Sequence, residues 1–375
     1  MKFSYALLCF SLTLENGQNA NIVHIPPNRT TGGLHMQVRK LIRFLSLAII
    51  PLLIMGSGPL AHAKAMKLTY ANFFPPFHGQ SQLAESWCKE VEKRTNGAIK
   101  IDYYPGSTLA KAPQTYDAVE QGMADIGMTV LAYSRGRFPV LGAVDLPMGY
   151  PDGVTATKVA NAVLEKFNPE EFNDTKVMYL HAHGPGYIFT IKEPVHTMED
   201  LKGKKIRSTG MSTILVKALG ASPVAQSMRD AYQSLQKGVV DGCAAPIEAN
   251  KGWKLAEVLD YCAMEKSVAY TTAMIVTMNK DKWAAISPEN QKVILDINTE
   301  WAIKHGKAWD DIDEEGKAFF LEKGGKIITL TPEESARWKA TVRPKLFEYA
   351  DSLNEKGING TEVVNFIIDT LEKNQ

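Results

Sequence analysis

The sequence predicts an α/β protein with mainly parallel sheets, divided between two similar lobes. From residue 66 onward, segments with the two-residue period of strands alternate with segments that have the period of helices. Two stretches, YDAVEQGMADI at 116–126 and YQSLQKGVVDG at 232–242, place Tyr, an aliphatic residue, Gly and Asp at the same offsets. The chain of 375 residues is also long enough for two domains.

The repeated stretch predicts one structural unit in both lobes. Tyr116 and Val119 in the first copy, like Tyr232 and Leu235 in the second, lie three residues apart on one face of a helix. The glycine that follows ends the helix in the left-handed conformation, and the next residues turn into a buried strand. The alternative is a chance likeness, because helix–Gly–strand units are common in α/β folds.

The N-terminal residues predict export. Residues 36–65 are typical of a signal peptide, since the basic segment QVRKLIR precedes the apolar run FLSLAIIPLLIMG and two overlapping A-x-A cleavage sites follow. The alternative is a membrane anchor, but a span needs about 20 apolar residues and this run is shorter. Residues 1–35 add nothing that a signal peptide needs, so we interpret them as a non-native extension and Met36 as the start.

Alternating strands and helices account for the chain after the signal peptide. Ile99 and Ile101 alternate as in a strand, whereas Leu83, Trp87 and Val91 have helical spacing. The predicted strands are 66–74, 98–104, 124–130, parts of 175–191, the ends of 198–210 and 230–246, and 326–330; the predicted helices are 78–97, 113–123, 212–220, the start of 230–246, and 332–354.

A continuous apolar stripe begins after Pro288. Apolar side chains from Ile294 through Trp301 and beyond recur at steps of three and four residues, which predicts one long helix. Some 33 residues would span roughly 50 Å, enough to brace two domains. The alternative is two helices broken near Gly306 or Gly316, since each Gly costs about 1 kcal/mol relative to Ala.

The cysteines after the signal peptide allow two interpretations. Cys88, Cys243 and Cys262 are an odd number for a disulfide framework in an exported protein. A Cys243–Cys262 bridge is one possibility, and buried free thiols are the other. We favour free thiols, because spacing alone does not bring two sulfurs together.

The sequence carries no motif for catalysis or for a cofactor. Its net charge is +1 and no basic stripe is interleaved with aromatics, so we expect no nucleic-acid partner. His181 and His183 share one face of a strand and could hold a metal, but no third ligand has a suitable spacing, so we interpret both as structural. The chain has no Walker A loop, dinucleotide fingerprint, H-E-x-x-H or G-x-S-x-G motif. We therefore expect no catalytic residue, no metal and no cofactor.

The ends of three predicted strands are the places where a ligand would bind. Ligands of open α/β sheets bind beyond the carboxyl ends of the strands. This rule indicates Val130–Tyr133, Arg207–Gly210 and Cys243–Glu248.

Six stretches make the chain resemble a known family. It resembles the extracytoplasmic solute-binding subunit of the tripartite ATP-independent periplasmic (TRAP) transporters over essentially all of 66–375. The matching stretches, in the family's order, are EQGMADIGM, SRGRFPVLGAVDLPMGYP, the HGPGY segment, DLKGKKIRSTG, ALGASPVAQSMRDAYQSLQKGVVDG and MIVTMNKDKWAAISPE.

The resemblance implies a two-lobed periplasmic binding protein, type II-like, with crossover strands as a hinge and the long helix as a strut. We expect lobe I at 66–184 and 272–312 and lobe II at 185–271 and 313–375. It also implies that a carboxylate-bearing solute is captured in the periplasm and delivered to membrane permease subunits, which an ion gradient drives without ATP hydrolysis. We expect the binding protein to be a monomer.

The resemblance also assigns a ligand residue. The family's arginine lies in a strand that reads K-[IL]-R, which is Arg207 here, and a guanidinium can grip a carboxylate with two parallel hydrogen bonds. Without the resemblance, Arg207 would be interpreted as a solvated surface residue. The chain departs from the sialic-acid and C4-dicarboxylate members at two positions: Tyr187 or Ile188 stands where many have Arg, and Ala245-Pro246 replaces Asn-Pro.

The other candidate ligand residues are mostly apolar. Few polar groups among several apolar ones favour a monocarboxylate with an apolar or aromatic body, although the aromatics could equally be ordinary core. A C4-dicarboxylate is the alternative ligand, and a secreted α/β enzyme or a ligand-sensing domain is the alternative class of protein. The candidates are Phe73, Phe74, Tyr133, Tyr187, Met228 and Ala245.

Two polar candidates have structural alternatives. Glu248 could accept a hydrogen bond from a ligand amine or hydroxyl, or it could sit at the start of a helix, where negative charge is favoured. His78 could donate to a carboxylate, or it could cap the first helix.

Overall fold

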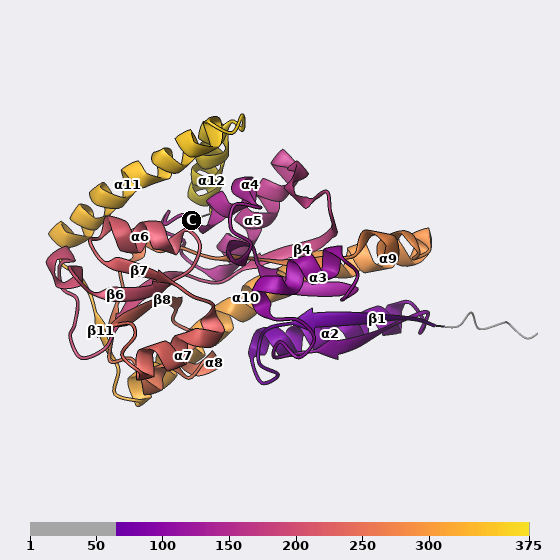
Figure 1. Ribbon diagram of the computed structural model, residues 1–375, viewed down its shortest axis with the longest axis horizontal. Coiled ribbons are helices and arrows are strands. Elements are labelled where there is room, and N and C mark those ends of the chain that lie inside the picture. Colours follow the sequence, from indigo (N-terminus) through magenta and orange to yellow (C-terminus); the bar gives the residue numbers. More distant parts are fainter. Residues whose placement is uncertain (1–64, 375) are drawn as a thin grey trace, which may run out of the picture. The chain divides into compact units, whose positions relative to one another are not determined.

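The computed structural model describes residues 65–374 and contains two β-sheets (Figure 1). The predicted extension 1–35 and signal peptide 36–65 lie outside the described residues, apart from Ala65. The first sheet has the order β2-β1-β3-β10-β4, with strands Ile99–Tyr104, Met66–Asn72, Ile126–Val130, Ala273–Met278 and Lys176–Ala182. The second has the order β11-β9-β5-β8-β6-β7, with strands Lys326–Ile328, Tyr261–Ala263, Gly186–Thr190, Gly242–Pro246, Lys205–Ser208 and Ser222–Ala225.

Each sheet is parallel apart from one strand. β10 runs antiparallel to both of its neighbours in the first sheet, and β5 does the same in the second. The chain passes from one sheet to the other between β4 and β5 and returns between β9 and β10. The predicted α/β class with mainly parallel sheets and crossover connections is confirmed.

The helices lie around the two sheets. Their ends carry the expected caps; Asp152, for example, accepts a hydrogen bond from the backbone of Thr155 at 2.6 Å. The α-helices are α2 (Gly79–Arg94), α3 (Thr115–Glu120), α4 (Pro139–Gly142), α5 (Gly153–Phe167), α6 (Ser212–Ala218), α7 (Met228–Gln236), α8 (Ala249–Gly252), α9 (Lys280–Ala284), α10 (Pro288–Glu322), α11 (Pro332–Asn354) and α12 (Gly360–Asn374). Single 3-10 turns are η1 (Ala112–Gln114), η2 (Leu131–Tyr133), η3 (Ala143–Asp145), η4 (Glu170–Phe172), η5 (Met198–Leu201), η6 (Leu255–Glu257) and η7 (Lys266–Val268).

The two copies of the repeated stretch form matching units, as predicted. α3 leads through Gly122 into β3 of the first sheet, and α7 leads through Gly238 into β8 of the second, with both glycines at positive φ. The aspartate of the repeat makes the same kind of hydrogen bond in both copies. Asp125 accepts from the backbone N–H of Thr69 on the neighbouring strand, and Asp241 accepts from that of Lys205, each at 2.8 Å.

α10 is one uninterrupted helix of 35 residues that passes both sheets (Figure 1). The single long helix is confirmed, and the alternative of a break near Gly306 or Gly316 is wrong. The glycines instead allow close approach. A Cβ on Gly306 would lie 3.2 Å from Thr157 of α5, and one on Gly316 would lie 2.5 Å from the Cα of Glu248, after β8.

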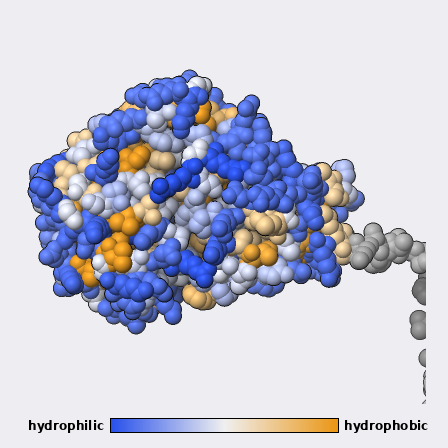
Figure 2. All heavy atoms as spheres, viewed as in Figure 1, coloured by the Kyte–Doolittle hydropathy of each residue, from blue (hydrophilic) through white to orange (hydrophobic). Residues whose placement is uncertain are grey.

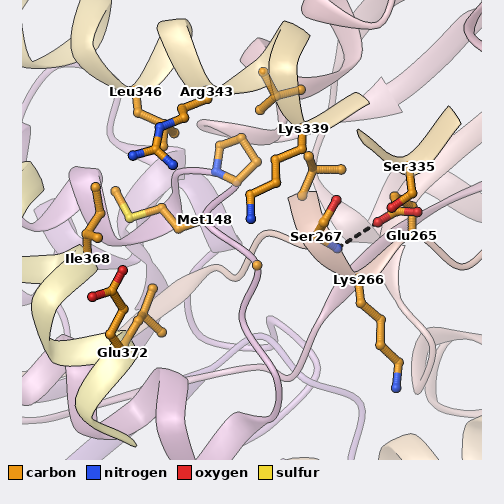
Figure 3. Close-up of a pocket in the computed structure, with 15 residues that line it drawn as sticks. Met148, Glu265, Lys266, Ser267, Ser335, Lys339, Arg343, Leu346, Ile368 and Glu372 are labelled. Carbon is orange, nitrogen blue, oxygen red and sulfur yellow. Dashed lines mark hydrogen bonds between the residues drawn. The ribbon is translucent and has the colours of Figure 1, made fainter. Parts of the chain in front are cut away.

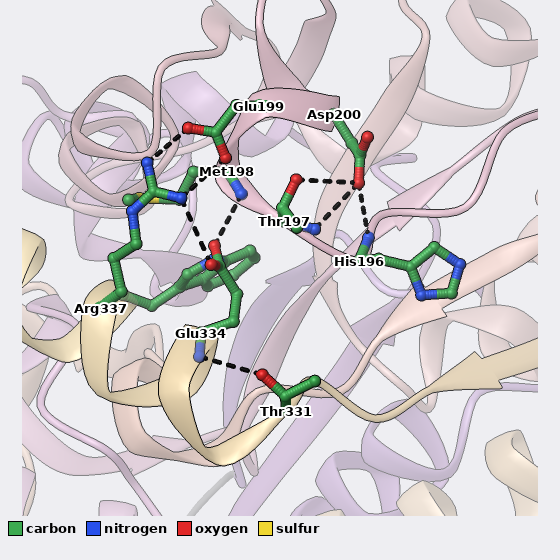
Figure 4. Close-up of polar contacts among 9 residues, drawn as sticks. His196, Thr197, Met198, Glu199, Asp200, Thr331, Glu334 and Arg337 are labelled. Atoms are coloured by element: carbon green, nitrogen blue, oxygen red, sulfur yellow. Dashed lines mark hydrogen bonds and ion pairs between the residues drawn. The ribbon is translucent and has the colours of Figure 1, made fainter.

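α11 is fixed to the second sheet's side of the molecule through η5 (Figure 4). Glu334 accepts hydrogen bonds from the backbone of Met198 at 2.8 Å and from the indole of Trp338 at 3.0 Å. Arg337 adds a two-pronged contact with Glu199. Trp338 is buried in the apolar core that α11 shares with the second sheet.

α12 packs on the first sheet's side instead. Val364 and Ile367 are buried with Val159 and Val163 of α5 in one apolar core. The lobe boundaries at 66–184, 272–312, 185–271 and 313–375 stay a prediction, and this packing favours moving 360–374 to the first lobe.

The three described cysteines are free, as predicted, and buried. Phe189 of β5 pairs with Cys243 on one side and with Cys262 on the other. The two cysteines are therefore two strand spacings apart, roughly 9–10 Å. A disulfide needs Cα atoms closer than about 7 Å, so no bridge can form without moving a strand.

The surface carries little continuous apolar area on the face that Figure 2 shows, where small apolar patches are separated by hydrophilic residues. No helix within residues 65–374 combines the length and apolar character that crossing a bilayer requires.

Candidate functional site

A small cavity of about 50 Å³ lies where the two sheets meet. Its walls come from the ends of β1, β3, β6 and β8, from the crossover that precedes β10, and from α10. Three of these strand ends are the ones that the sequence indicated. The lining residues are Phe73, Phe74, Val130, Tyr133, His183, Arg207, Thr209, Met228, Pro246, Glu248, Trp253, Tyr270, Thr272, Met274 and Trp309.

Arg207 lies in β6 with only 4% of its surface exposed. Its guanidinium donates from Nε and Nη2 to the carbonyl oxygen of Gln226, at 3.1 and 2.8 Å. Nη2 also donates to the hydroxyl of Thr209 at 3.1 Å, and Nη1 donates to the carbonyl of Ala244 at 3.2 Å. Among residues 65–374, no carboxylate forms an ion pair with Arg207.

The hydrogen bonds of Arg207 leave its charge uncompensated. A guanidinium has five N–H donors. Four of them meet neutral oxygens, and the remaining donor on Nη1 has only the weak acceptor Cys243 Sγ at 4.0 Å. Both protons of Nη2 are taken, by Gln226 and by Thr209, so the remaining Nη1 donor is the one that a ligand carboxylate could use without displacing a protein acceptor. A buried charge without an opposite charge is costly, so an anion bound at this position would be stabilised.

Tyr133 and Met228 meet beside Arg207. The backbone N–H of Met228 donates to the Tyr133 hydroxyl at 3.0 Å. Because the hydroxyl accepts this bond, its own proton is free to donate into the cavity. Burial raises the pKa of Tyr133, although the nearby Arg207 charge lowers it in part, so the hydroxyl stays protonated at neutral pH.

His78 and Glu248 form a second polar group in the wall. The ring Nδ1 of His78 accepts from the backbone of Gln80 at 3.2 Å, which caps α2, and Nε2 contacts Glu248 Oε2 at 3.1 Å. Since Nδ1 accepts, Nε2 carries the proton and donates. Glu248 is 2% exposed and stands at the N-cap of α8, as the helix-start alternative expected, but its side chain makes no capping bond there.

Asp313 supports Glu248 from α10. Its Oδ1 accepts from the backbone N–H of Glu248 at 3.0 Å. Burial, together with the neighbouring Glu248 charge, raises the pKa of Asp313 to about 8. Asp313 therefore keeps its proton to a higher pH than a solvent-exposed aspartate does.

Aromatic rings fill the wall between the two polar groups. Phe73 stacks on Phe74 with centroids 4.4 Å apart, and Phe73 also contacts Tyr133 edge-on at 5.9 Å. Phe74 stacks in turn on His78 at 4.3 Å. A continuous series of rings thus joins the Arg207 side of the cavity to the Glu248 side.

Six of the nine candidate residues line the cavity and His78 supports it, but Tyr187 and Ala245 do not line it. These two are cross-strand partners in β5 and β8, and both are buried in the core beneath the second sheet with Phe320. Their strands end near the cavity, but the two side chains point away from it. The structure therefore does not bring these two residues together with the other candidates.

The structure adds lining residues that sequence reasoning missed. His183 was interpreted as structural, yet it lines the cavity; its Nδ1 donates to the Gly184 carbonyl at 2.5 Å, and burial lowers its pKa to about 4. Its neutral ring therefore presents an acceptor at Nε2. His181 does lie in the core, where it accepts from the Trp309 indole at 3.0 Å. The other missed residues are Trp253, Tyr270, Thr272, Met274 and Trp309.

A larger groove of about 510 Å³ lies beside α11 and α12 (Figure 3). Lys339 extends into it from α11 beside Met148, and Glu265 accepts from the backbone of Ser267 at 2.8 Å at its edge. None of the candidate residues lines this groove. It also has no aromatic wall, so the small cavity between the sheets is the better ligand site.

Comparison with known proteins identifies the family of the chain. Residues 70–352 match the family described as bacterial extracellular solute-binding protein, family 7. A curated relative, the C4-dicarboxylate-binding periplasmic protein of Rhodobacter capsulatus, is 26% identical over 310 residues, which are 80% of this chain and 90% of that protein.

Two solved structures are similar over nearly their whole length. One is a marine metagenome TRAP solute-binding protein specific for aromatic acid ligands, in complex with metahydroxyphenylacetate. It has a TM-score of 0.78 and 29% identity, over 82% of this chain and 99% of that one. The other is a TRAP solute-binding protein from Rhodoferax ferrireducens T118 with copurified benzoate. It has a TM-score of 0.78 and 26% identity, over 82% of this chain and 98% of that one.

Proposed function

This chain belongs to the bacterial extracellular solute-binding proteins, family 7, and from that premise we propose that it binds a monocarboxylate with an apolar or aromatic body in the Arg207 cavity. The matches also confirm the predicted resemblance to the solute-binding subunits of TRAP transporters. Proteins of this kind are extracytoplasmic, bind small organic acids and work with membrane permease subunits.

The buried guanidinium of Arg207 is the observation that carries the proposal. It is 4% exposed and has no carboxylate partner within residues 65–374. A ligand carboxylate would accept from the remaining Nη1 donor and from the Tyr133 hydroxyl, and it would compensate the charge. Charge-assisted hydrogen bonds of this kind are roughly twice as strong as neutral ones.

The rest of the wall favours one carboxylate over two. Among the described lining residues, Arg207 is the only Lys or Arg, and His183 is neutral at pH 7 because burial lowers its pKa to about 4. A second carboxylate would face aromatic rings or the negative Glu248. The aromatic-acid ligands of two relatives support the same proposal. The relative named for C4-dicarboxylates supports the alternative, a C4-dicarboxylate.

The cellular role follows from the family and the N-terminal sequence. We propose that residues 36–65 direct export to the periplasm, and that a monomer closes around its ligand and delivers it to TRAP permease subunits. A ligand-sensing domain and a secreted enzyme are the alternative classes. A binding protein would release its ligand unchanged, which NMR of the recovered acid would test.

A thermal-shift screen of organic acids tests the ligand class. At a concentration 100-fold above the dissociation constant, a ligand stabilises the folded state by about 2.7 kcal/mol. We expect benzoate and phenylacetate to raise the melting temperature more than succinate and malate do. Shifts with succinate and malate but none with the apolar monocarboxylates would overturn the monocarboxylate proposal in favour of the alternative.

A further inference from the structure

Glu248 shares one small cavity with Arg207, yet the two opposite charges do not pair. Both side chains are buried and both line the cavity. The side chain that Glu248 contacts is His78, with Nε2 and Oε2 3.1 Å apart. Phe73 and Phe74, which stack on each other, stand between the two charges.

The carboxylate of Glu248 has unused capacity to accept hydrogen bonds. An ionised carboxylate has about four acceptor positions on its two oxygens. Oε2 accepts from His78, while Oε1 has no donor among residues 65–374. Although the residue is 2% exposed, Oε1 is not sealed from solvent, so this oxygen can accept from a donor that the ligand brings.

Three neighbours hold the Glu248 side chain in place. His78 donates to Oε2, and Asp313 accepts from the Glu248 backbone. The backbone of Gly252 also approaches closely, because a Cβ there would lie 2.4 Å from Oε2. The carboxylate is therefore fixed before a ligand arrives, as expected of a group that selects a ligand.

We propose that Glu248 accepts a hydrogen bond from a hydroxyl or ammonium group at the end of the ligand remote from its carboxylate. The solute is then a small acid with a polar donor at its far end. This inference rests on the proposed function for the carboxylate end of the ligand. A second carboxylate at the far end would be repelled by Glu248, and an apolar end would bring Oε1 no donor.

Matched aromatic acids test the inference by isothermal titration calorimetry. The probes are 3- and 4-hydroxybenzoate, their methyl isosteres 3- and 4-methylbenzoate, 3- and 4-(aminomethyl)benzoate, and benzoate. We expect at least one hydroxyl or ammonium acid to bind tenfold or more tightly than its methyl isostere. Comparing the affinities of the hydroxybenzoates with those of the (aminomethyl)benzoates shows whether a hydroxyl or an ammonium donor is preferred. The inference is overturned if no donor-bearing acid exceeds its isostere.

Variants assign the preference to Glu248. In Glu248→Ala the preference for a donor-bearing acid over its methyl isostere should fall below threefold. Glu248→Gln keeps the shape and one neutral acceptor, so an ammonium preference should disappear in it; this variant also serves if Glu248→Ala does not fold. Glu265→Gln is the matched control, because Glu265 is a buried glutamate at the other groove, and it should keep the full preference.

The outcomes separate this inference from the proposed function. The inference would be overturned, and the proposed function kept, by either of two results. In the first, benzoate binds but no donor-bearing acid binds more tightly than its methyl isostere. In the second, the higher affinity of the donor-bearing acid persists in Glu248→Ala. Failure of every acid to bind the wild-type protein would overturn the proposed function and the inference together.

Discussion

The backbone N–H of Met228 donates a hydrogen bond to the hydroxyl of Tyr133 at 3.0 Å. Tyr133 ends the turn after β3 of the first sheet, and Met228 begins α7 beside the second. The bond therefore ties the two sides of the cavity together next to Arg207. It also orients the tyrosine so that its own proton remains available to a ligand.

Tyr133→Phe should weaken binding of benzoate. The change removes the acceptor for the Met228 N–H and one donor to the ligand, and an unsatisfied buried donor costs about 1–3 kcal/mol. We expect the dissociation constant to rise by about fivefold to a hundredfold in calorimetric titrations. Tyr150→Phe is the control, since its hydroxyl bonds to Val144 within the first core, at 2.6 Å; it should lower the melting temperature and leave affinity intact. Unchanged affinity in Tyr133→Phe would contradict the role given to this bond.

Asp313→Asn should remove part of the pH dependence of stability. Burial and the Glu248 charge raise the pKa of Asp313 to about 8, well above its unfolded value. A raised pKa means that the contribution of Asp313 is fully present below about pH 4 and is lost as the pH rises to about 8, by at most about 1.4 kcal/mol per pH unit. The stability of the variant relative to wild type should therefore grow from pH 4 to pH 8 and level off above it.

Guanidinium unfolding at four pH values between 5 and 9 measures this difference. Asparagine keeps an oxygen that can accept from the Glu248 backbone, so the variant should fold. Parallel pH curves for the two proteins would show that Asp313 ionises normally in the folded state.

Gly316→Ala should destabilise the protein although alanine favours helices. The new Cβ would lie 2.5 Å from Glu248 Cα and from the Ile247 carbonyl, so α10 must move away from the segment after β8. Overpacking costs typically about 1–3 kcal/mol, which exceeds the roughly 1 kcal/mol gained in helix propensity. We expect a lower melting temperature and weaker binding. Lys307→Ala, on the exposed face of α10, should change neither; a higher melting temperature for Gly316→Ala would refute the close approach.

The described cysteines should resist thiol reagents in the native protein. Burial raises the pKa of the Cys88, Cys243 and Cys262 thiols, so little thiolate exists at neutral pH. Mass-spectrometric mapping after iodoacetamide treatment should find these three unlabelled in buffer and labelled in guanidinium. A dithiothreitol-dependent change in melting temperature, or a Cys243–Cys262 peptide pair, would contradict the two-strand separation.

Local patterns were sufficient for much of the fold. The strand and helix periods placed most elements, and the stripe after Pro288 predicted α10, because a buried helix face must be apolar. α12 was missed, although Val363, Val364, Ile367 and Leu371 have the spacing of a helix buried on one side. The sequence alone did not show that Gly316 lets α10 pack closely against the segment after β8. Only the tertiary contact distinguishes such a glycine from one that breaks a helix.

The site was predictable where it follows strand ends. The carboxyl-end rule and the family likeness brought Arg207, Tyr133 and Glu248 together correctly in one cavity. The same rule placed Tyr187 and Ala245 at the cavity, which they do not line. The rule locates the end of a strand and not the direction in which a side chain points. Trp253, Tyr270, Thr272 and Trp309 come from a loop, a crossover and α10, and no local pattern indicates that these meet at the cavity.

The affinity of Arg207→Ala for benzoate tests the central claim most directly. Removing one partner of a buried charge pair costs about 3–5 kcal/mol, so calorimetry should show a dissociation constant raised by at least a hundredfold. Arg207→Lys should restore little of the loss, because an ammonium lacks the planar fork. Circular dichroism and the melting temperature of each variant should show that it is folded. A folded Arg207→Ala protein that binds benzoate as tightly as wild type would contradict the claim that Arg207 holds the ligand carboxylate.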